Sequence, residues 1–313
     1  MSWSATDIPD QTGRTVVVTG ANSGLGYHAS AELARRGARV VMACRDAGRG
    51  AEALARLRTV APTAPVVVEP LDLASLASVR DFSDRLSEQF PDGIDVLLNN
   101  AGVMATPPRK TADGFELQLG TNHLGHFALT GLVLPLLLRR PGARVVTVSS
   151  QAHRMGRIDF SDLMSERKYQ KWRAYGQSKL ANLLFAFELA RRAEAAGLDL
   201  KSVAAHPGYA NTNLQAVGPR MAGNSLMEKL TGVANVLFGQ PAADGALPEL
   251  YAATMPDVRT GEFFGPSGFA ETRGTPKRVA SSAAAQDLLV AERLWAESER
   301  LTGVTYEALR PAA

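Results

Sequence analysis

Short runs of β-branched and other apolar residues alternate with longer helical patterns along the first two thirds of this chain of 313 residues. Six of these runs are interpreted as buried strands, at residues 15–19, 38–43, 65–69, 95–99, 144–149 and 200–205. Strands that are apolar throughout are typical of a sheet covered by helices on both faces. The alternation therefore predicts an α/β fold with a doubly wound parallel sheet. Ligands of such sheets bind beyond the carboxyl ends of the strands, so the residues that follow each strand are the functional candidates.

A glycine cluster with the spacing Gly-x-x-x-Gly-x-Gly follows the first strand. Glycines let the backbone turn tightly and approach a pyrophosphate, and the helix that begins here offers N–H groups and a partial positive charge. Turns also collect glycine without any ligand. Because this cluster lies between a valine-rich strand and a helix, we expect a dinucleotide site. Its residues are Gly20, Asn22, Ser23, Gly24, Leu25 and Gly26.

The end of the second strand indicates which nicotinamide dinucleotide binds. A carboxylate there holds the ribose hydroxyls of NAD, whereas an arginine favours the 2′-phosphate of NADP. Cys44 occupies the carboxylate's place, and Arg45 could pair with a phosphate and stack on the adenine. We therefore predict NADP(H). In one alternative Asp46 holds the ribose and the cofactor is NAD(H); in another Arg45 is solvated and Asp46 only caps the next helix.

Residues after the third and fourth strands extend the predicted nucleotide pocket. Asp72 and Leu73 could hold the adenine, although Asp72 could also be only a helix cap. Small residues after the fourth strand would let the cofactor ribose lie close to the backbone. The positions there are Asn99, Ala101 and Gly102.

Tyr175 and Lys179 lie four residues apart on the strongest predicted helix and therefore share one face. A phenol has a reference pKa of about 10, which makes it a poor base at neutral pH. A nearby ammonium favours the phenolate and lowers that pKa, which improves acid–base catalysis. The pair alone could be a surface pair on a helix. The other polar residues at the strand ends make the catalytic interpretation of the pair more specific. Ser149 and Ser150 end the fifth strand, and Asn122 lies in the helix after the fourth.

With these motifs in this order, the chain resembles the short-chain dehydrogenase/reductase family from about residue 14 to residue 212. The matching stretches are Thr19-Gly-x-x-x-Gly-x-Gly26, Asn99-Asn-Ala-Gly102, Asn122, Ser150, Tyr175-x-x-x-Lys179 and Pro207-Gly208. The resemblance implies a Rossmann fold. It also implies hydride transfer to or from nicotinamide C4, with the protein placing the substrate and handling the proton.

The resemblance implies a role for each catalytic candidate. Tyr175 is the proton donor and acceptor at the carbonyl or alcohol oxygen, and Ser150 hydrogen-bonds the same oxygen. Lys179 holds the nicotinamide ribose and lowers the pKa of Tyr175. Asn122 kinks its helix and holds a water in a proton relay. Ser149 competes with Ser150, but Ser150 stands at the family's position after the strand.

Several longer sequence stretches are similar to those of the retinol-dehydrogenase-like branch of the family. This similarity implies a preference for NADP and apolar carbonyl substrates. The phrases are Ala43-Cys-Arg-Asp46, Thr121-Asn-His-Leu-Gly-His-Phe127, Val148-Ser-Ser-Gln-Ala-His153, Ser178-Lys-Leu-Ala-Asn-Leu-Leu-Phe185 and His206-Pro-Gly208. In this pattern Thr212 touches the nicotinamide amide, beyond the cofactor-binding Pro207 and Gly208. Unlike many membrane-bound retinol enzymes, the chain shows no apolar anchor before its first strand.

Composition argues against several other partners. The balance of 34 Lys and Arg against 31 Asp and Glu, with no basic run, does not indicate nucleic-acid binding. Cys44 is the single cysteine, which excludes an internal disulfide and a cysteine-built zinc site, and no histidine has a metal-ligand spacing. The N-terminus does not resemble a signal peptide, and residues 132–138 fall far short of the ~20 needed to span a bilayer. We therefore expect a cytoplasmic protein without a metal.

The length gives a prior of about two domains, yet the glycine loop and the catalytic residues lie on successive strand ends of one sheet. We therefore predict a single domain. Its parts are a lead at 1–13, the cofactor-binding and catalytic core at 14–208, a substrate-lid excursion at 209–245, and the last strand and C-terminal helix at 246–313. The excursion could equally be a core-packed helix pair. A homodimer or homotetramer through the helices near Asn122 and Tyr175 is implied by the resemblance.

The predicted function is that of an NADP(H)-dependent oxidoreductase acting on the carbonyl or alcohol of a small apolar substrate, with Tyr175 as general acid and base. The alternative is a non-catalytic NADP(H)-binding sensor or scaffold. Such a protein would not need Asn122, Ser150, Tyr175 and Lys179 together.

Overall fold

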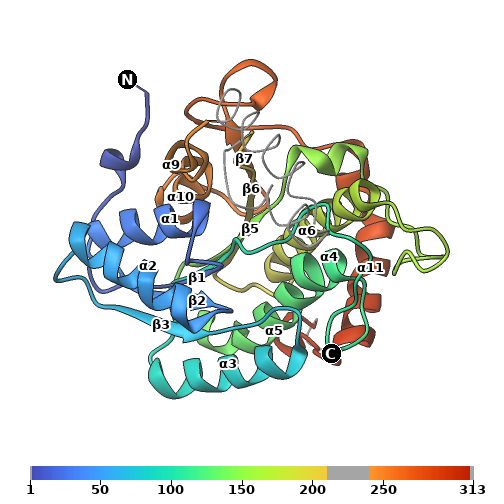
Figure 1. Ribbon diagram of the computed structural model, residues 1–313, viewed down its shortest axis with the longest axis horizontal. Helices are drawn as coiled ribbons and strands as arrows, with labels where there is room; N and C mark the ends of the chain where they lie inside the picture. Colours follow the sequence, from blue (N-terminus) through green and yellow to red (C-terminus); the bar gives the residue numbers. More distant parts are fainter. Residues whose placement is uncertain (1, 210–239, 311–313) are drawn as a thin grey trace.

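The computed structural model describes residues 2–209 and 240–310. Within them the chain builds one domain around a sheet whose strand order is β3-β2-β1-β4-β5-β6-β7-β8 (Figure 1). All neighbours pair in parallel except β7 and β8, which are antiparallel. The predicted α/β fold is confirmed. The strands are β1 (Thr15–Thr19), β2 (Arg39–Cys44), β3 (Val66–Pro70), β4 (Val96–Asn99), β5 (Ala143–Val148), β6 (Leu200–Ala205), β7 (Phe263–Pro266) and β8 (Pro276–Arg278).

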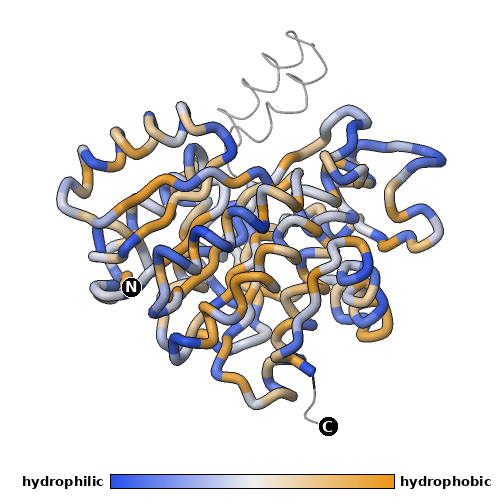
Figure 2. The backbone as a smooth tube through the Cα atoms, turned by 90° about the horizontal axis from the view of Figure 1, so that it is seen from below, coloured by the Kyte–Doolittle hydropathy of each residue, from blue (hydrophilic) through white to orange (hydrophobic). Residues whose placement is uncertain are grey.

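Helices cover both faces of the sheet, which explains why the strands carry no polar alternation. In β1, Val16 and Val18 pack into one core cluster and Val17 into the other. The first cluster takes in α1 (Gly24–Arg35), α2 (Ala47–Val60) and α10 (Leu247–Thr254). The second takes in α3 (Leu76–Gln89), α5 (Gly125–Leu137), α6 (Lys171–Ala195) and α11 (Leu288–Thr302). Apolar stretches follow the central strands, and polar residues lie on loops and outer helix faces (Figure 2).

Short helical segments complete the described chain. They are α4 (Leu117–Leu119), α9 (Ala242–Gly245), a π-helical turn η2 (Gly120–Leu124), and the 3-10 helices η1 (Ala5–Asp7), η3 (Gln151–Met155), η4 (Phe269–Glu271), η5 (Ala283–Gln286) and η6 (Glu307–Leu309). Asn122, where the resemblance implies a kink, lies in this π-helical turn. Most of the predicted excursion, residues 210–239, lies outside the described residues. The division of the chain into those four parts stays a prediction.

The edge of the sheet differs from the expectation. The last strand predicted within residues 246–313 is β7, and it is followed by β8, which the sequence did not indicate. The three residues of β8 are a proline and two cations, Lys277 and Arg278, both exposed. Charged and proline-containing strands are typical of sheet edges, where they prevent further pairing. An edge strand of this kind has no apolar pattern to detect.

The C-terminal helix α11 covers the outer side of α5 and α6. Its Trp295 stacks on Phe185 of α6 at a ring distance of 5.8 Å and contacts Phe127 of α5 at 5.1 Å. Tyr306 follows α11, lies 4.6 Å from the Trp295 ring and donates a hydrogen bond to the Phe127 carbonyl at 2.6 Å. The face of α5 and α6 that the resemblance assigned to a subunit contact is therefore covered by the chain itself.

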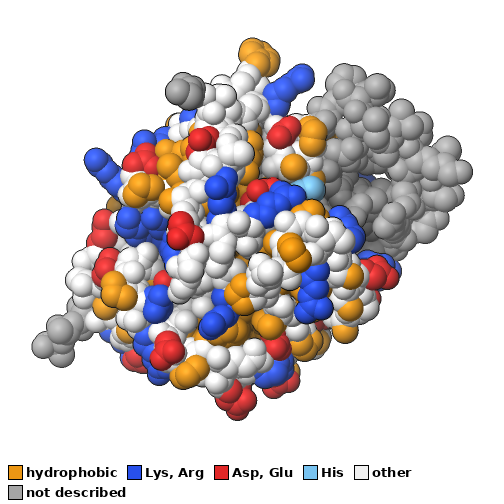
Figure 3. All heavy atoms as spheres, turned by 90° about the vertical axis from the view of Figure 1, so that its left-hand side faces the viewer, with side chains coloured by type: hydrophobic (Ala, Val, Ile, Leu, Met, Phe, Trp, Pro, Cys, Tyr) orange, Lys and Arg blue, Asp and Glu red, His pale blue; other side chains and the backbone are white. Residues whose placement is uncertain are grey.

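The described residues show no charged patch on the face in Figure 3, no membrane-spanning helix and no metal-binding cluster. Positive and negative side chains are interspersed on the face seen in Figure 3. No helix in the described part of the chain is long and apolar enough to cross a bilayer. In residues 2–209 and 240–310, His, Cys, Asp and Glu form no group of three that could hold a metal ion.

Candidate active site

The glycine loop between β1 and α1 is shaped as a cradle. Gly20 and Gly24 have φ of +67° and +56°, a region that side chains rarely adopt. A Cβ on Gly26 would lie 2.4 Å from Asn100 Nδ2 and 2.7 Å from the Gly20 carbonyl oxygen. Ser23, at the N-cap of α1, makes no side-chain capping bond, so the first N–H groups of the helix are available to bind an anion. These features fit a dinucleotide pyrophosphate.

Thr19 joins this loop to the residues that follow β4. Its hydroxyl accepts hydrogen bonds from the N–H groups of Asn100 and Ala101 at 3.0 and 2.9 Å. Asn100 Nδ2 donates to the Thr19 carbonyl at 2.7 Å. The side chain of Asn99 is instead buried and donates to Thr130 Oγ1 at 3.0 Å. Of the two asparagines, Asn100 supports the glycine loop, and Asn99 could reach a cofactor only through its backbone.

Asn122 lies in the π-helical turn and is fully buried. Its Oδ1 accepts from the Val103 N–H at 2.8 Å, and its Nδ2 donates to the Val103 carbonyl and to Ser178 Oγ, both at 2.9 Å. The side chain therefore ties the loop after β4 to α6. A Cβ on Gly102 would lie 3.2 Å from Asn122 Oδ1 and 3.5 Å from Lys179 Nζ, so these three predicted residues meet.

A histidine connects Asn122 with the glycine loop. His126 Nδ1 lies 3.0 Å from the Asn122 carbonyl and Nε2 lies 2.9 Å from Thr19 Oγ1. Burial lowers the pKa of His126 to about 4, so the ring is neutral. A carbonyl can only accept, so Nδ1 carries the proton and Thr19 donates to Nε2. His126 therefore links the two halves of the site.

Tyr175 and Lys179 occupy one face of α6, as predicted, and both are buried. Lys179 Nζ lies 6.0 Å from the centre of the Tyr175 ring and donates to the Val148 carbonyl at 3.0 Å. The Ser150 hydroxyl, directly after β5, hydrogen-bonds Tyr175. Ser149 points elsewhere, because its hydroxyl donates to the Lys179 carbonyl at 2.7 Å. The geometry brings Ser150, Tyr175 and Lys179 together and leaves Ser149 in a structural role.

The pKa of Tyr175 differs from the sequence expectation. Burial raises it to about 12, while the hydrogen bond with Ser150 acts in the opposite direction. Burial disfavours the phenolate and sets this direction, so a lowering of the Tyr175 pKa by Lys179 stays a prediction. Tyr175 is therefore a protonated hydroxyl at neutral pH.

A buried carboxyl group that sequence reasoning missed acts on Lys179. Burial lowers the pKa of Lys179 to about 8, and the charge of Glu249 raises it. Glu249, on α10, is 2% exposed, and burial raises its pKa to about 8 while Lys179 lowers it. The two groups favour each other's charged form. No local pattern could have indicated Glu249, because it comes from the helix layer opposite α6.

The residues at the end of β2 bear on whether Arg45 or Asp46 faces the cofactor ribose. Asp46 is the N-cap of α2 and accepts from the Arg49 N–H at 2.9 Å. Arg45 is exposed, whereas Cys44 is fully buried and burial raises its thiol pKa to about 11. Asp46 therefore has a capping function that does not depend on a ligand. Cys44 is a wall residue.

The remaining cofactor candidates divide into three groups. Asp72 accepts from the Ala74 N–H at 3.0 Å in the turn before α3, whose N-cap is Ser75 rather than Asp72, and Leu73 is buried. Gly208 follows Pro207 after β6 with φ of +67°. Thr212 lies outside the described residues.

His153 follows Ser150 closely in the sequence. It is 1% exposed, its Nδ1 donates to the Ser150 carbonyl at 2.7 Å, and its Nε2 accepts from the Ser282 N–H at 3.2 Å. Both ring nitrogens are thus occupied by the backbone. His153 therefore supports the turn after Ser150.

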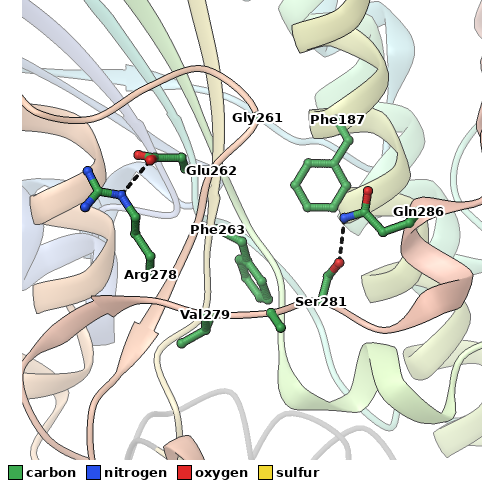
Figure 4. A pocket seen from close by; sticks show the side chains of 9 residues that line it. Phe187, Gly261, Glu262, Phe263, Arg278, Val279, Ser281 and Gln286 are labelled. Atoms are coloured by element: carbon green, nitrogen blue, oxygen red, sulfur yellow. Dashed lines mark hydrogen bonds and ion pairs between the residues drawn. The ribbon is translucent and has the colours of Figure 1, made fainter.

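A cavity of about 330 Å³ opens between α6 and β7 (Figure 4). Arg278 pairs with Glu262 on one side, and Gln286 donates to Ser281 at 2.8 Å on the other. The cavity contains none of the predicted site residues. Its lining is Phe187, Gly261, Glu262, Phe263, Arg278, Val279, Ala280, Ser281 and Gln286.

Known proteins resemble this chain over the residues that form the candidate site. The family model described as short chain dehydrogenase matches residues 14–221. Mouse retinol dehydrogenase 14 is 43% identical over 304 residues, which cover 93% of this chain and 86% of that protein.

Two solved structures resemble the fold. A crystal structure of an uncharacterised protein from Mycobacterium paratuberculosis has a TM-score of 0.80 and 46% identity, covering 98% of this chain and 99% of that one. The Pseudomonas aeruginosa RhlG complex with NADP has a TM-score of 0.61 and 25% identity, covering 80% of this chain and 94% of that one.

Proposed function

Because this chain belongs to the short chain dehydrogenase family and is retinol-dehydrogenase-like, we propose that it is an NADP(H)-dependent oxidoreductase for an apolar carbonyl or alcohol. The observation that supports this best is the convergence of Ser150, Tyr175, Lys179 and Asn122 beside the glycine cradle. When bound, the nicotinamide supplies or accepts the hydride.

In the direction of reduction, the Tyr175 hydroxyl donates its proton to the substrate carbonyl oxygen. Ser150 hydrogen-bonds that oxygen and places it against Tyr175. The Lys179 ammonium stabilises the phenolate that remains, and Glu249 supports the ammonium. In oxidation the same groups act in reverse, with the phenolate accepting the proton from the alcohol. Asn122 holds the loop after β4 against α6, and in the proposal it also places a relay water.

The preference for NADP(H) is supported by the chemistry at the end of β2. Asp46 is engaged as a helix cap, and Arg45 is exposed where a 2′-phosphate would lie. An arginine pairs with a phosphate through two parallel hydrogen bonds. The bound NADP named for Pseudomonas aeruginosa RhlG agrees with this choice.

A panel of apolar aldehydes, ketones and quinones, retinal among them, tests the proposal. We expect oxidation of NADPH, followed by absorbance, with at least one apolar carbonyl and much less with NADH. Tight NADPH binding without turnover on the whole panel would instead favour the sensor or scaffold alternative.

The two directions should respond differently to pH. Lys179 keeps its ammonium below about pH 8, and Tyr175 keeps its proton throughout the working range. Reduction, which needs the hydroxyl and the ammonium, should be constant below pH 8 and fall about tenfold per unit above it. Oxidation needs the phenolate, so its rate should rise about tenfold per unit up to pH 8 and then level off.

The measurement is kcat/KM in both directions between pH 6 and about 10, at saturating cofactor. The ratio of the two rates must follow the proton released in oxidation. The test of Tyr175 and Lys179 is therefore whether the oxidation rate alone changes below pH 8 and the reduction rate alone changes above it. A reduction rate that already falls between pH 6 and about 7 would contradict the assignment of Tyr175 and Lys179.

The packing of α11 on α5 and α6 predicts that the chain does not dimerise through those helices. Trp295 is 3% exposed within the monomer, so the apolar centre of this face is already buried by the chain itself. Light scattering on the eluting protein gives the number of associated chains, and cross-linking locates any contact between them. A stable dimer whose cross-links map to α5 and α6 would contradict this prediction, whereas contacts through another face would not.

A further inference from the structure

The loop between β7 and β8, residues 267–275, lies against the turn that follows β6. Its own backbone closes it, because the Ser267 N–H donates to the Thr275 carbonyl and the Gly268 N–H to the Arg273 carbonyl, both at 2.8 Å. The Tyr209 N–H donates to the Thr272 carbonyl at 2.9 Å. The loop is therefore a defined element that contacts the candidate cofactor turn.

Two consecutive residues of this loop have strained backbones. Ala270 and Glu271 have φ of 48° and 54°, the left-handed region. This region is unfavourable for residues with a side chain, and such strain persists where the surroundings determine the conformation. What the strain achieves here is the position of the Glu271 carboxylate.

One oxygen of that carboxylate joins two segments of the site. Glu271 Oε2 accepts from Gln151 Nε2 at 2.8 Å, and Gln151 directly follows Ser150. The same oxygen lies 3.0 Å from Nε2 of His206, which directly precedes Pro207. Arg154 Nη2 stands 3.7 Å away and is the further charged group at this carboxylate.

The proton on His206 can be assigned. Its Nδ1 accepts from the Gly208 N–H at 3.2 Å, so Nε2 carries the hydrogen and donates to Glu271. Burial lowers the pKa of His206 to about 4, which keeps the ring neutral. Gly208 permits the close approach, because a Cβ there would lie 2.4 Å from the Thr272 carbonyl oxygen.

We propose that Glu271 is a positioning residue that fixes the Pro207–Gly208 turn relative to Ser150. The inference rests on the proposed function: the resemblance implies that Pro207 and Gly208 bind the cofactor, and Ser150 holds the substrate oxygen. Hydride transfer requires reacting atoms within about 3–3.5 Å, and a misplacement of about 1 Å can cost 10²-fold in rate. A shared hydrogen-bond acceptor between the two holding segments sets this spacing.

The test compares Glu271→Ala with Glu271→Gln. The alanine variant should raise the NADPH dissociation constant about tenfold and lower kcat about tenfold, since both segments lose their shared acceptor. The glutamine variant should stay within about threefold of the parent for both, because its Oε1 can accept the same two bonds. NADPH binding is measured by fluorescence titration, which needs no turnover, and circular dichroism establishes that each variant is folded.

Two further variants separate positioning from general loss of structure. Gln151→Ala leaves the loop and His206 intact, so it should lower kcat about threefold with an unchanged NADPH dissociation constant. Phe269→Ala is the matched loop control, because that side chain is 93% exposed, and it should leave NADPH binding unchanged.

The proposal is overturned by an alanine variant with parental binding and kcat, or by a glutamine variant as impaired as alanine. If Glu271→Ala does not fold, the Glu271→Gln and Gln151→Ala results decide by the same criteria. A parent protein that binds no NADPH would refute the proposed function itself. A parent that binds and turns over while the Glu271 variants are unaffected would refute only this inference.

Discussion

Replacing Tyr175 with phenylalanine is expected to lower kcat in both directions by roughly 10²–10⁴-fold, the usual range for a removed acid–base group. The ring of Tyr175 is buried beside Lys179, and its hydroxyl is the group that Ser150 contacts. Phenylalanine keeps the ring and removes only the proton donor. NADPH binding, measured by fluorescence titration, should remain within about threefold of the parent.

Tyr251→Phe is the matched control for this experiment. The hydroxyl of Tyr251 donates to the exposed Asp257 at 2.9 Å and not to a catalytic residue, so its loss should leave kcat unchanged. Turnover near the parental rate in Tyr175→Phe would refute the assignment of the acid and base. Equal losses in both variants would point to a general effect of removing a tyrosine hydroxyl.

Replacing Arg45 with alanine should raise KM for NADPH by roughly 10–100-fold, because a charge-assisted hydrogen bond contributes about 1.5–3 kcal/mol. KM for NADH should change less than about threefold, since NADH lacks the 2′-phosphate. The readout is the ratio of kcat/KM for the two cofactors with one carbonyl substrate. Arg58→Ala, an exposed arginine near the end of α2, serves as the control for a lost surface charge.

If the ratio of kcat/KM for NADPH and NADH is unchanged in Arg45→Ala, Arg45 does not bind the 2′-phosphate. The NAD(H) alternative makes the opposite prediction, in which Asp46→Asn weakens NADH binding selectively. In our interpretation that substitution acts mainly on the cap of α2 and affects both cofactors equally.

Much of the candidate site follows from local sequence. The glycine spacing, the Tyr175 and Lys179 pair, and Ser150 at a strand end each depend on residues close together in the chain. Parallel topology then brings the strand ends to one edge. The kink at Asn122, implied by the resemblance, is present as a π-helical turn.

Other parts could not be predicted because they depend on contacts between distant segments. Glu249 acts on Lys179 from 70 positions along the chain, and burial sets the direction of the Tyr175 pKa against the expectation. Glu271 joins Gln151 and His206 across separations of 120 and 65 residues. Neither Glu249 nor Glu271 belongs to a periodic pattern or a motif.

The sequence by itself determined the fold class, the edge of the sheet where chemistry can occur and the residue types gathered there, because hydrophobic periodicity and turn chemistry act over a few residues. Only the tertiary structure decided which serine faces Tyr175, that α11 covers α5 and α6, and how buried groups titrate. Those properties depend on desolvation and on hydrogen bonds between segments, and both arise only when the layers pack.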